Sequence, residues 1–200
     1  RYQAVAQELG ELAYQVNATF TPKKGYTFNA NYSNVSNDSL DLFQEIFVDF
    51  EMRKTKYKLL LGGQLINYNQ EVYENEPDRP MVQTITPFVE LTYKFDRKKS
   101  MRVELQYQQC EQDYGSWVYG LLEYNIAPKW SFAVSDMWNY EPLRTEEALH
   151  YYSIFTGYTH KSSRFTLNYV KQIAGIVCTG GVCRYEPAFS GLKAGLVTTF

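Results

Sequence analysis

Apolar and polar residues alternate along most of this chain with a period of two. In residues 12–20 every even-numbered residue is apolar, and every odd-numbered residue except Ala13 is polar. Successive side chains of a β-strand point to opposite faces, so this pattern predicts a strand with one apolar face. The pattern recurs, with varying clarity, in residues 1–9, 26–33, 45–53, 57–70, 89–96, 101–108, 116–127, 130–141, 148–160, 164–176 and 186–200. The sequence therefore predicts about twelve strands.

The connections between these segments alternate between short and long. The short connections lie near residues 23–25, 54–56, 97–100, 127–129 and 161–163. The longer connections, which are polar or rich in Gly and Pro, lie near residues 35–41, 71–82, 141–147 and 174–185. The brief link at 113–116 is the one exception. This alternation is typical of outer-membrane barrels, which have short periplasmic turns and longer extracellular loops.

A soluble sandwich or a lipocalin-like barrel is the main alternative. Against it, aromatic residues gather at both ends of the apolar face, where lipid interfaces favour them, and charged residues lie at mid-strand on the polar face. No run approaches the roughly 18 apolar residues that a transmembrane helix needs. We therefore predict one all-β domain over residues 1–200, a transmembrane antiparallel up-and-down barrel or part of a larger one. Pro87 lies inside a predicted strand, where a β-bulge is the expected accommodation.

The charges on the polar face are the main candidate functional residues. We predict that these side chains line the lumen: Asp49, Glu51, Arg53, Lys58, Glu90, Lys94, Arg102, Glu104, Glu123 and Lys193. They can set the selectivity of a pore. They can equally form a salt-bridged interior that keeps a narrow barrel shut, because facing opposite charges satisfy one another. The sequence leaves both readings open.

The last strand carries a recognisable pattern. Lys193, Gly195 and Phe200 resemble the C-terminal signal by which outer-membrane barrels are recognised for insertion. With the preceding segment 177–187, this end resembles a family of Bacteroidota outer-membrane barrels without an established activity. The resemblance implies an outer-membrane location in a Gram-negative bacterium, with lipid and the barrel-insertion machinery as partners. It also implies a chain that is the C-terminal part of a longer protein.

The cysteines and histidines offer little chemistry. Cys178 and Cys183 flank Gly180-Gly181, so we expect a disulfide in an oxidising envelope, with two free thiols as the alternative. Cys110 is expected to be a plain buried or luminal thiol. His150 and His160 lie at opposite ends of one predicted strand, so no histidine metal site is expected. A serine–histidine pair from His150 and Ser153 is conceivable, although no Gly-x-Ser-x-Gly elbow is present.

These observations favour a non-enzymatic outer-membrane barrel without a cofactor. It would act as a narrow pore or as a structural subunit of an envelope complex with other outer-membrane proteins. A carrier of hydrophobic compounds and a surface hydrolase are weaker alternatives. With 20 basic and 22 acidic residues and no basic stripe, nucleic-acid binding has no support. The acidic long loops lack the ligand spacing of an EF-hand, and Asp38-Ser39-Leu40 resembles a short glycosylation signal of Bacteroidota.

Overall fold

Eleven antiparallel strands form one continuous sheet in a computed structural model, which describes residues 2, 4, 10–37, 40–173, 175–179 and 182–199. For residues 175–179 and 182–186 only the backbone is described. Every neighbour in the sheet is also a neighbour in sequence, except that β10 is followed by β13. The strands are β1 (Leu12–Lys23), β2 (Tyr26–Asn37), β3 (Leu40–Arg53), β4 (Tyr57–Tyr68), β5 (Val82–Lys94), β6 (Lys99–Cys110), β7 (Gly115–Ile126), β8 (Trp130–Pro142), β9 (His150–His160), β10 (Ser163–Gln172) and β13 (Phe189–Thr198).

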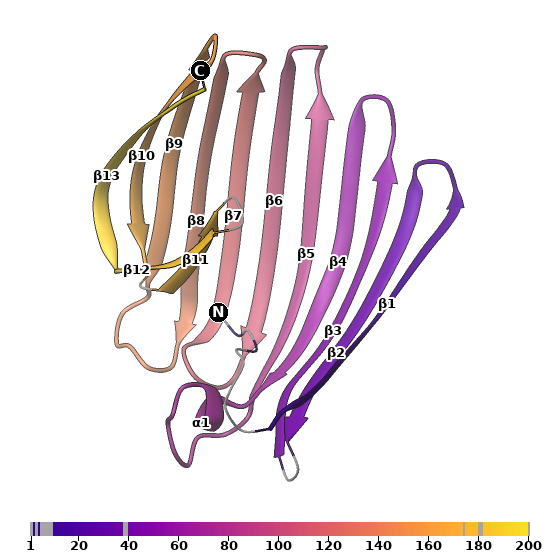
Figure 1. Ribbon diagram of the computed structural model, residues 1–200, viewed down its shortest axis with the longest axis vertical. Coiled ribbons are helices and arrows are strands. Elements are labelled where there is room, and N and C mark those ends of the chain that lie inside the picture. The colour runs from indigo at the N-terminus through magenta and orange to yellow at the C-terminus, as the bar shows by residue number, and fades with distance from the viewer. Residues whose placement is uncertain are drawn as a thin grey trace.

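The short and long connections lie at opposite ends of the sheet. Figure 1 shows the tight turns along one end, with the C-terminus near them, and the longer connections with helix α1 (Gln70–Tyr73) at the other end. Asn69 caps α1, because its side chain accepts a hydrogen bond from the Val72 amide at 3.2 Å. We call these the short-turn end and the long-loop end. The predicted alternation of connections therefore corresponds to two distinct ends of the molecule.

The predicted fold class, an all-β antiparallel up-and-down sheet, is confirmed. One predicted loop is wrong in part, because residues 174–185 contain a hairpin of β11 (Gly175–Thr179) and β12 (Val182–Glu186) that forms its own two-stranded sheet. The described residues thus hold thirteen strands rather than about twelve. No helix of the described chain is long and apolar enough to cross a membrane.

Pro87 does not produce the expected bulge. The pairing of β5 with β6 keeps one register on both sides of Pro87, from Ile85 opposite Gln109 to Phe88 opposite Gln106. The two intervening residue pairs are not hydrogen-bonded partners, since proline has no amide hydrogen to donate. The strand therefore accommodates the proline by losing pairing locally, without an extra residue.

The two faces of the sheet have inverted exposure. Large apolar side chains on one face are open to the surroundings, with Leu12, Phe20 and Leu105 exposed by 66%, 65% and 52%. On the other face the side chains of Glu90 and Glu104 are only 15% and 18% exposed. A soluble sheet normally buries its apolar face. We call the apolar side the outer face and the polar side the inner face.

The described sheet has two free edges, β1 and β13. All twelve residues of β1 are exposed. Because the sheet is antiparallel throughout and β1 and β13 are its first and eleventh members, these two edge strands run in the same direction. They cannot join each other as an antiparallel pair.

Candidate functional site

A ladder of ion pairs crosses the inner face from β3 to β7. Arg53 pairs with Glu51 at 2.9 Å, and Lys58 bridges Glu51 at 3.6 Å and Glu90 at 3.5 Å. The strand register brings these side chains together. Arg53 on β3 lies opposite Lys58 on β4, and Lys58 lies opposite Thr92 on β5. The ladder therefore follows directly from the strand register.

Arg102 is the centre of the ladder. Its guanidinium lies 3.1 Å from Glu90, 3.5 Å from Glu104 and 3.0 Å from Glu123. Arginine suits this position because its planar guanidinium presents five N–H donors to several carboxylates at once. One cation on β6 thus joins carboxylates on three strands.

Amide side chains extend this polar network toward β1. Asn29 donates to Asp49 at 2.9 Å, and Gln15 donates to Asn31 at 2.7 Å. Gln64 donates to Glu45 from the neighbouring strand. The amides satisfy carboxylate oxygens that would otherwise lack a partner on a half-buried surface. Apart from Asp49, these residues were not predicted as site residues, although the alternation along β1–β4 places them on the polar face.

The structure gives the ten predicted lumen-lining charges different environments. Seven of them form the ladder: Glu51, Arg53, Lys58, Glu90, Arg102, Glu104 and Glu123. Asp49 accepts from Asn29, and Lys94 is exposed at the end of β5. Lys193, on β13, donates to Gln172 at 2.6 Å and lies over the Phe189 ring. The register therefore brings seven of these residues into one chain of contacts and leaves Lys193 on a distant strand.

The apolar Phe47 on the inner face has a packing role. Its ring stacks on Phe88 at a centroid separation of 5.7 Å. Gly62, between the two strands that carry these rings, leaves the required space: a Cβ there would lie 2.4 Å from Phe88 Cζ and 2.6 Å from the Val48 carbonyl oxygen. A hydrophobic pair therefore sits within the polar face because one position on β4 has no side chain.

The inner face has two unlike halves. The charged wall, on β3–β7, holds Glu45, Asp49, Glu51, Arg53, Lys58, Glu90, Lys94, Arg102, Glu104 and Glu123. The neutral wall, on β8–β10 and β13, holds mostly small or uncharged side chains such as Ser135, Ser153 and Gly157. Away from the ends of these strands, its charged side chains within the described residues are Arg164 and Lys193. The charged wall thus carries six carboxylates and four cations, whereas the neutral wall carries two cations.

The long loops are joined by one arginine. Arg144 contacts Glu76 at 2.9 Å and Asp113 at 2.8 Å, and donates to Gln70 at 3.1 Å. Its hydrogen bond lowers the pKa of Glu76, assisted by the charges of Arg144 and Arg79. Three connections that are distant in sequence are therefore held together at the long-loop end. Sequence reasoning missed this cluster, because its members share no local spacing.

Tyr2 lies against the same end of the inner face. Its hydroxyl donates to Asp113 at 2.7 Å, and its ring lies 5.3 Å from that of Tyr68. It belongs to a small apolar cluster with Phe43, Ile66, Tyr68, Val82 and Cys110. This cluster, together with the Arg144 contacts, fills part of the long-loop end with side chains.

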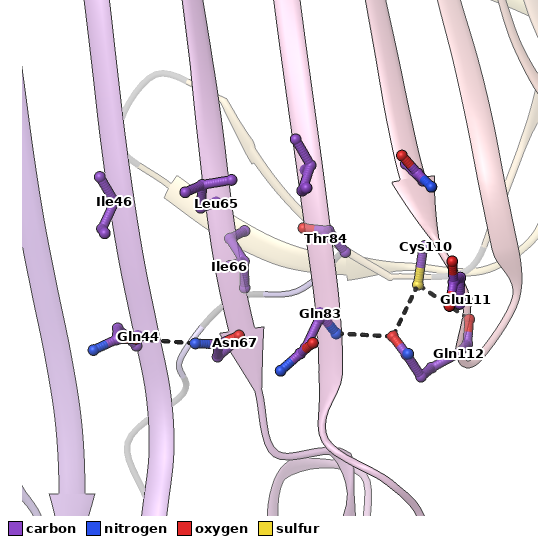
Figure 2. A pocket seen from close by; sticks show the side chains of 12 residues that line it. Gln44, Ile46, Leu65, Ile66, Asn67, Gln83, Thr84, Cys110, Glu111 and Gln112 are labelled. Atoms are coloured by element: carbon purple, nitrogen blue, oxygen red, sulfur yellow. Dashed lines mark hydrogen bonds between the residues drawn. The ribbon is translucent and has the colours of Figure 1, made fainter.

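A hollow of about 360 Å³ lies where β3–β6 reach the long loops (Figure 2). Gln44 accepts from Asn67 at 2.9 Å, and the side chain of Gln112 accepts from the Gln83 amide at 3.0 Å. Cys110, a free and buried thiol, donates to the Gln112 carbonyl at 3.1 Å. At this end of β3–β6 the apolar row of the outer face is followed by polar side chains, so the hollow lies where that row ends.

The remaining predicted residues show no catalytic or metal arrangement in the described part of the chain. His150 contacts Asp136 at 2.7 Å on the outer face, whereas Ser153 donates to Asn168 on the inner face. The conceivable serine–histidine pair is therefore wrong, because residues three apart on a strand point to opposite faces. Among the described residues no group of three His, Cys, Asp or Glu side chains could hold a metal ion.

Parts of the predicted terminal features lie outside the described residues. The register places Cys178 opposite Cys183, but their side chains are not described. Lys193 and Gly195 lie on the inner face of β13, and Phe200 is outside the described residues, as are Asp38 and Ser39. The disulfide and the insertion signal stay predictions.

Comparison with known proteins gives a family but no activity. A search of curated proteins finds no match. Among solved structures, a triple mutant of the Rhodopseudomonas blastica porin is 9% identical and has a TM-score of 0.31, with 80% of this chain and 84% of that chain covered. Another mutant of the same porin is 10% identical, with a TM-score of 0.30. TM-scores of this size are too low to support an inference about this chain. The match that covers nearly the whole sequence, residues 2–200, is to DUF6029, a family of unknown function, and the chain belongs to that family.

Proposed function

We propose that this chain forms much of the wall of an outer-membrane β-barrel, with its outer face against lipid and its inner face around a narrow, charge-compensated pore. The inverted exposure of the two faces carries this proposal. Leaving rows of Leu, Val, Ile and Phe in water would cost about 25 cal/mol for each Å² of apolar surface, whereas lipid removes this cost. The resemblance of the C-terminal strand supports a Gram-negative outer membrane, that of a Bacteroidota species.

The free edges require further strands. In an up-and-down barrel every neighbour is antiparallel, so the number of strands is even. Since β1 and β13 run in the same direction, an odd number of additional strands must lie between them to close the wall. We propose that the same polypeptide supplies these strands, as in single-chain outer-membrane barrels.

The ion-pair ladder supports a narrow interior. Mixed charges that pair with one another present little net field to a passing ion, and the side chains occupy lumen space. The Arg144 contacts and the Tyr2 cluster further restrict the long-loop end. The polar character of the inner face disfavours a carrier of hydrophobic compounds, and the separation of His150 from Ser153 disfavours a hydrolase built on that pair.

Conductance in planar lipid bilayers tests the pore. The full-length protein, purified in detergent, should give small stepwise currents with weak ion preference. Glu104→Lys removes a carboxylate beside Arg102 and adds a cation, so the reversal potential in a salt gradient should shift toward anion selectivity. Glu147→Lys, in the connection between β8 and β9, is the matched control and should shift it much less. Equal shifts in the two variants would place the selectivity outside the charged wall.

A structural subunit of an envelope complex is the second candidate function. The clamp of three long loops by Arg144 favours it, because a rigid loop surface suits a stable contact with another outer-membrane protein. Inserted protein that gives no current steps, yet copurifies with a defined partner lost on disruption of Arg144, would support this function over the pore. Recovery of a folded, monodisperse protein from plain buffer without detergent would contradict both.

A further inference from the structure

The two ends of the sheet carry opposite charge. Connecting residues 23–26, 54–56, 95–99, 127–129 and 161–163, at the short-turn end, include nine Lys or Arg and one acidic residue. Residues 70–81, 111–114 and 141–149, at the long-loop end, include nine acidic and two basic residues. The one acidic residue among the short turns, Asp96, accepts backbone hydrogen bonds from Lys98 and Lys99 at 2.7 and 2.9 Å, which lower its pKa. The short-turn end is therefore strongly basic.

Two of these lysines meet at one tyrosine. The ammonium of Lys54 lies 2.7 Å from the Tyr26 hydroxyl, to which it donates, and 4.5 Å from the centre of the Tyr26 ring. The ammonium of Lys23 also lies 4.5 Å from the centre of that ring. Within the described residues, no carboxylate lies within ion-pair distance of either lysine. Two cations and a phenol thus converge without an acidic side chain among them.

Backbone geometry brings these residues together. The amide of Arg53 donates to the carbonyl of Gly25 at 2.8 Å, which ties the β1–β2 turn to the end of β3. Gly25 has a φ of +84°, and a Cβ there would lie 2.5 Å from the Arg53 carbonyl oxygen, so a side chain would not fit. The Lys54 amide then donates to the Tyr57 carbonyl at 2.8 Å and closes the next turn. Lys54 is held beside Tyr26 by these contacts.

The chemistry of this cluster suits a phosphate group. Two ammonium groups supply charge and hydrogen-bond donors, and the Tyr26 hydroxyl can supply another donor once Lys54 turns toward the ligand. Aromatic residues lie at the same end of the sheet. They include Tyr57 and Trp130, the first residues of β4 and β8, and Tyr93, the last residue but one of β5. Tyrosine and tryptophan at strand ends favour the headgroup level of a bilayer. A phosphate presented at that level belongs to a lipid.

We infer that Lys23, Lys54 and Tyr26 form a binding site for the phosphate of an anionic phospholipid in the leaflet next to the short turns. This inference rests on the proposed membrane location of the sheet. The remaining basic turn residues raise the local concentration of anionic lipid, and the three-residue cluster makes the specific contact. The acidic long-loop end faces the opposite leaflet, where an anionic headgroup would meet repulsion.

Competition between phosphatidylglycerol and phosphatidylcholine tests this site. The full-length protein, folded in a neutral detergent, is titrated with an equimolar mixture of the two lipids, and retained lipids are counted by native mass spectrometry. The wild type should retain phosphatidylglycerol in preference. The Lys23→Ala/Lys54→Ala variant should lose most of that preference. We expect the ratio of retained phosphatidylglycerol to phosphatidylcholine to fall about fivefold for each lysine removed.

Lys24→Ala/Lys56→Ala is the matched control, because it removes the same charge from the same two turns without touching the cluster at Tyr26. It should lose clearly less preference, and Tyr26→Phe should show an intermediate loss. Equal losses in the two double variants would overturn the site and leave only a diffuse basic surface. An unchanged preference in Lys23→Ala/Lys54→Ala would also overturn it. Heat-dependent mobility on gels verifies the folded barrel in each sample, so failure to fold in detergent would count against the proposed function and not against the lipid site alone.

Discussion

The two halves of the inner face follow the same alternation but have different chemistry. On the charged wall, long side chains reach across strands and pair through Arg102 and Lys58. On the neutral wall, the corresponding positions are mostly uncharged, from small ones such as Ser135 and Gly157 to large ones such as Met137 and Phe155. The difference teaches that alternation fixes which face is polar, whereas the residue types at the inward positions decide whether that face is charged.

Removal of Arg102 should have the largest effect on this contrast. Arg102→Gln leaves the part-buried Glu104 and Glu123 without a cation and Glu90 with Lys58 alone, which we expect to destabilise the folded protein by about 3 kcal/mol, somewhat reduced by their partial exposure. Urea unfolding of the protein in lipid vesicles, followed by tryptophan fluorescence, measures this. The control Lys94→Gln removes an exposed charge from the same wall and should cost less than about 0.5 kcal/mol. A similar cost for both variants would mean that the ladder adds nothing specific.

Filling the space at Gly62 should have the next largest effect. Gly62→Ala places a methyl group against Phe88 and the Val48 carbonyl, so we expect a loss of about 1–3 kcal/mol from overpacking. Gly63→Ala, one residue along on the outer face, meets nothing closer than 3.9 Å and should be nearly neutral. The same unfolding measurement separates the two. If Phe88→Ala in the Gly62→Ala background gave no recovery, the clash with Phe88 would not be the cause.

The clamp of the long loops should depend on pH. The pKa of the Glu76 carboxyl is lowered in the folded state, chiefly by its hydrogen bond from Arg144. Its contribution to the clamp is therefore present above the unfolded pKa of about 4.3 and is lost as the pH falls through the folded value. The hydrogen-exchange protection of residues 70–81, expressed relative to the intrinsic exchange rate at each pH, should fall below about pH 4. Arg144→Gln should show low protection at neutral pH and little further change on acidification; high protection in that variant would contradict the clamp.

The disulfide should have the smallest effect on the sheet. Opposite Cα atoms of an antiparallel pair lie about 4.5–5.5 Å apart, within the range that a disulfide spans, so Cys178 and Cys183 can be joined. Reduction should add about 2 Da to the intact mass and expose two further thiols to alkylation. The bond constrains only the β11–β12 hairpin, so Cys178→Ser should change the stability of the main sheet by less than about 0.5 kcal/mol. Alkylation of all three cysteines without a reductant would exclude the bond.

The sequence determined the class of the fold and the assignment of its faces. Period-two alternation over segments such as 12–20 requires strands with one apolar side, and the alternating connections require two unlike ends. This is local information, since each strand and turn depends mainly on its own residues. The sequence also placed Glu90, Arg102 and Glu123 on the polar face, because parity along a strand follows from the backbone alone.

Tertiary structure decided which of these residues meet. The register joins Arg102 to carboxylates on three strands and leaves Lys193 far from the ladder, and neither result follows from parity. The contact of Arg144 with Glu76 and the meeting of Lys23, Lys54 and Tyr26 join residues from separate turns or loops. Such contacts depend on strand register and on backbone approaches such as Gly25 to Arg53, which are set by the pairing of whole strands and not by any one segment.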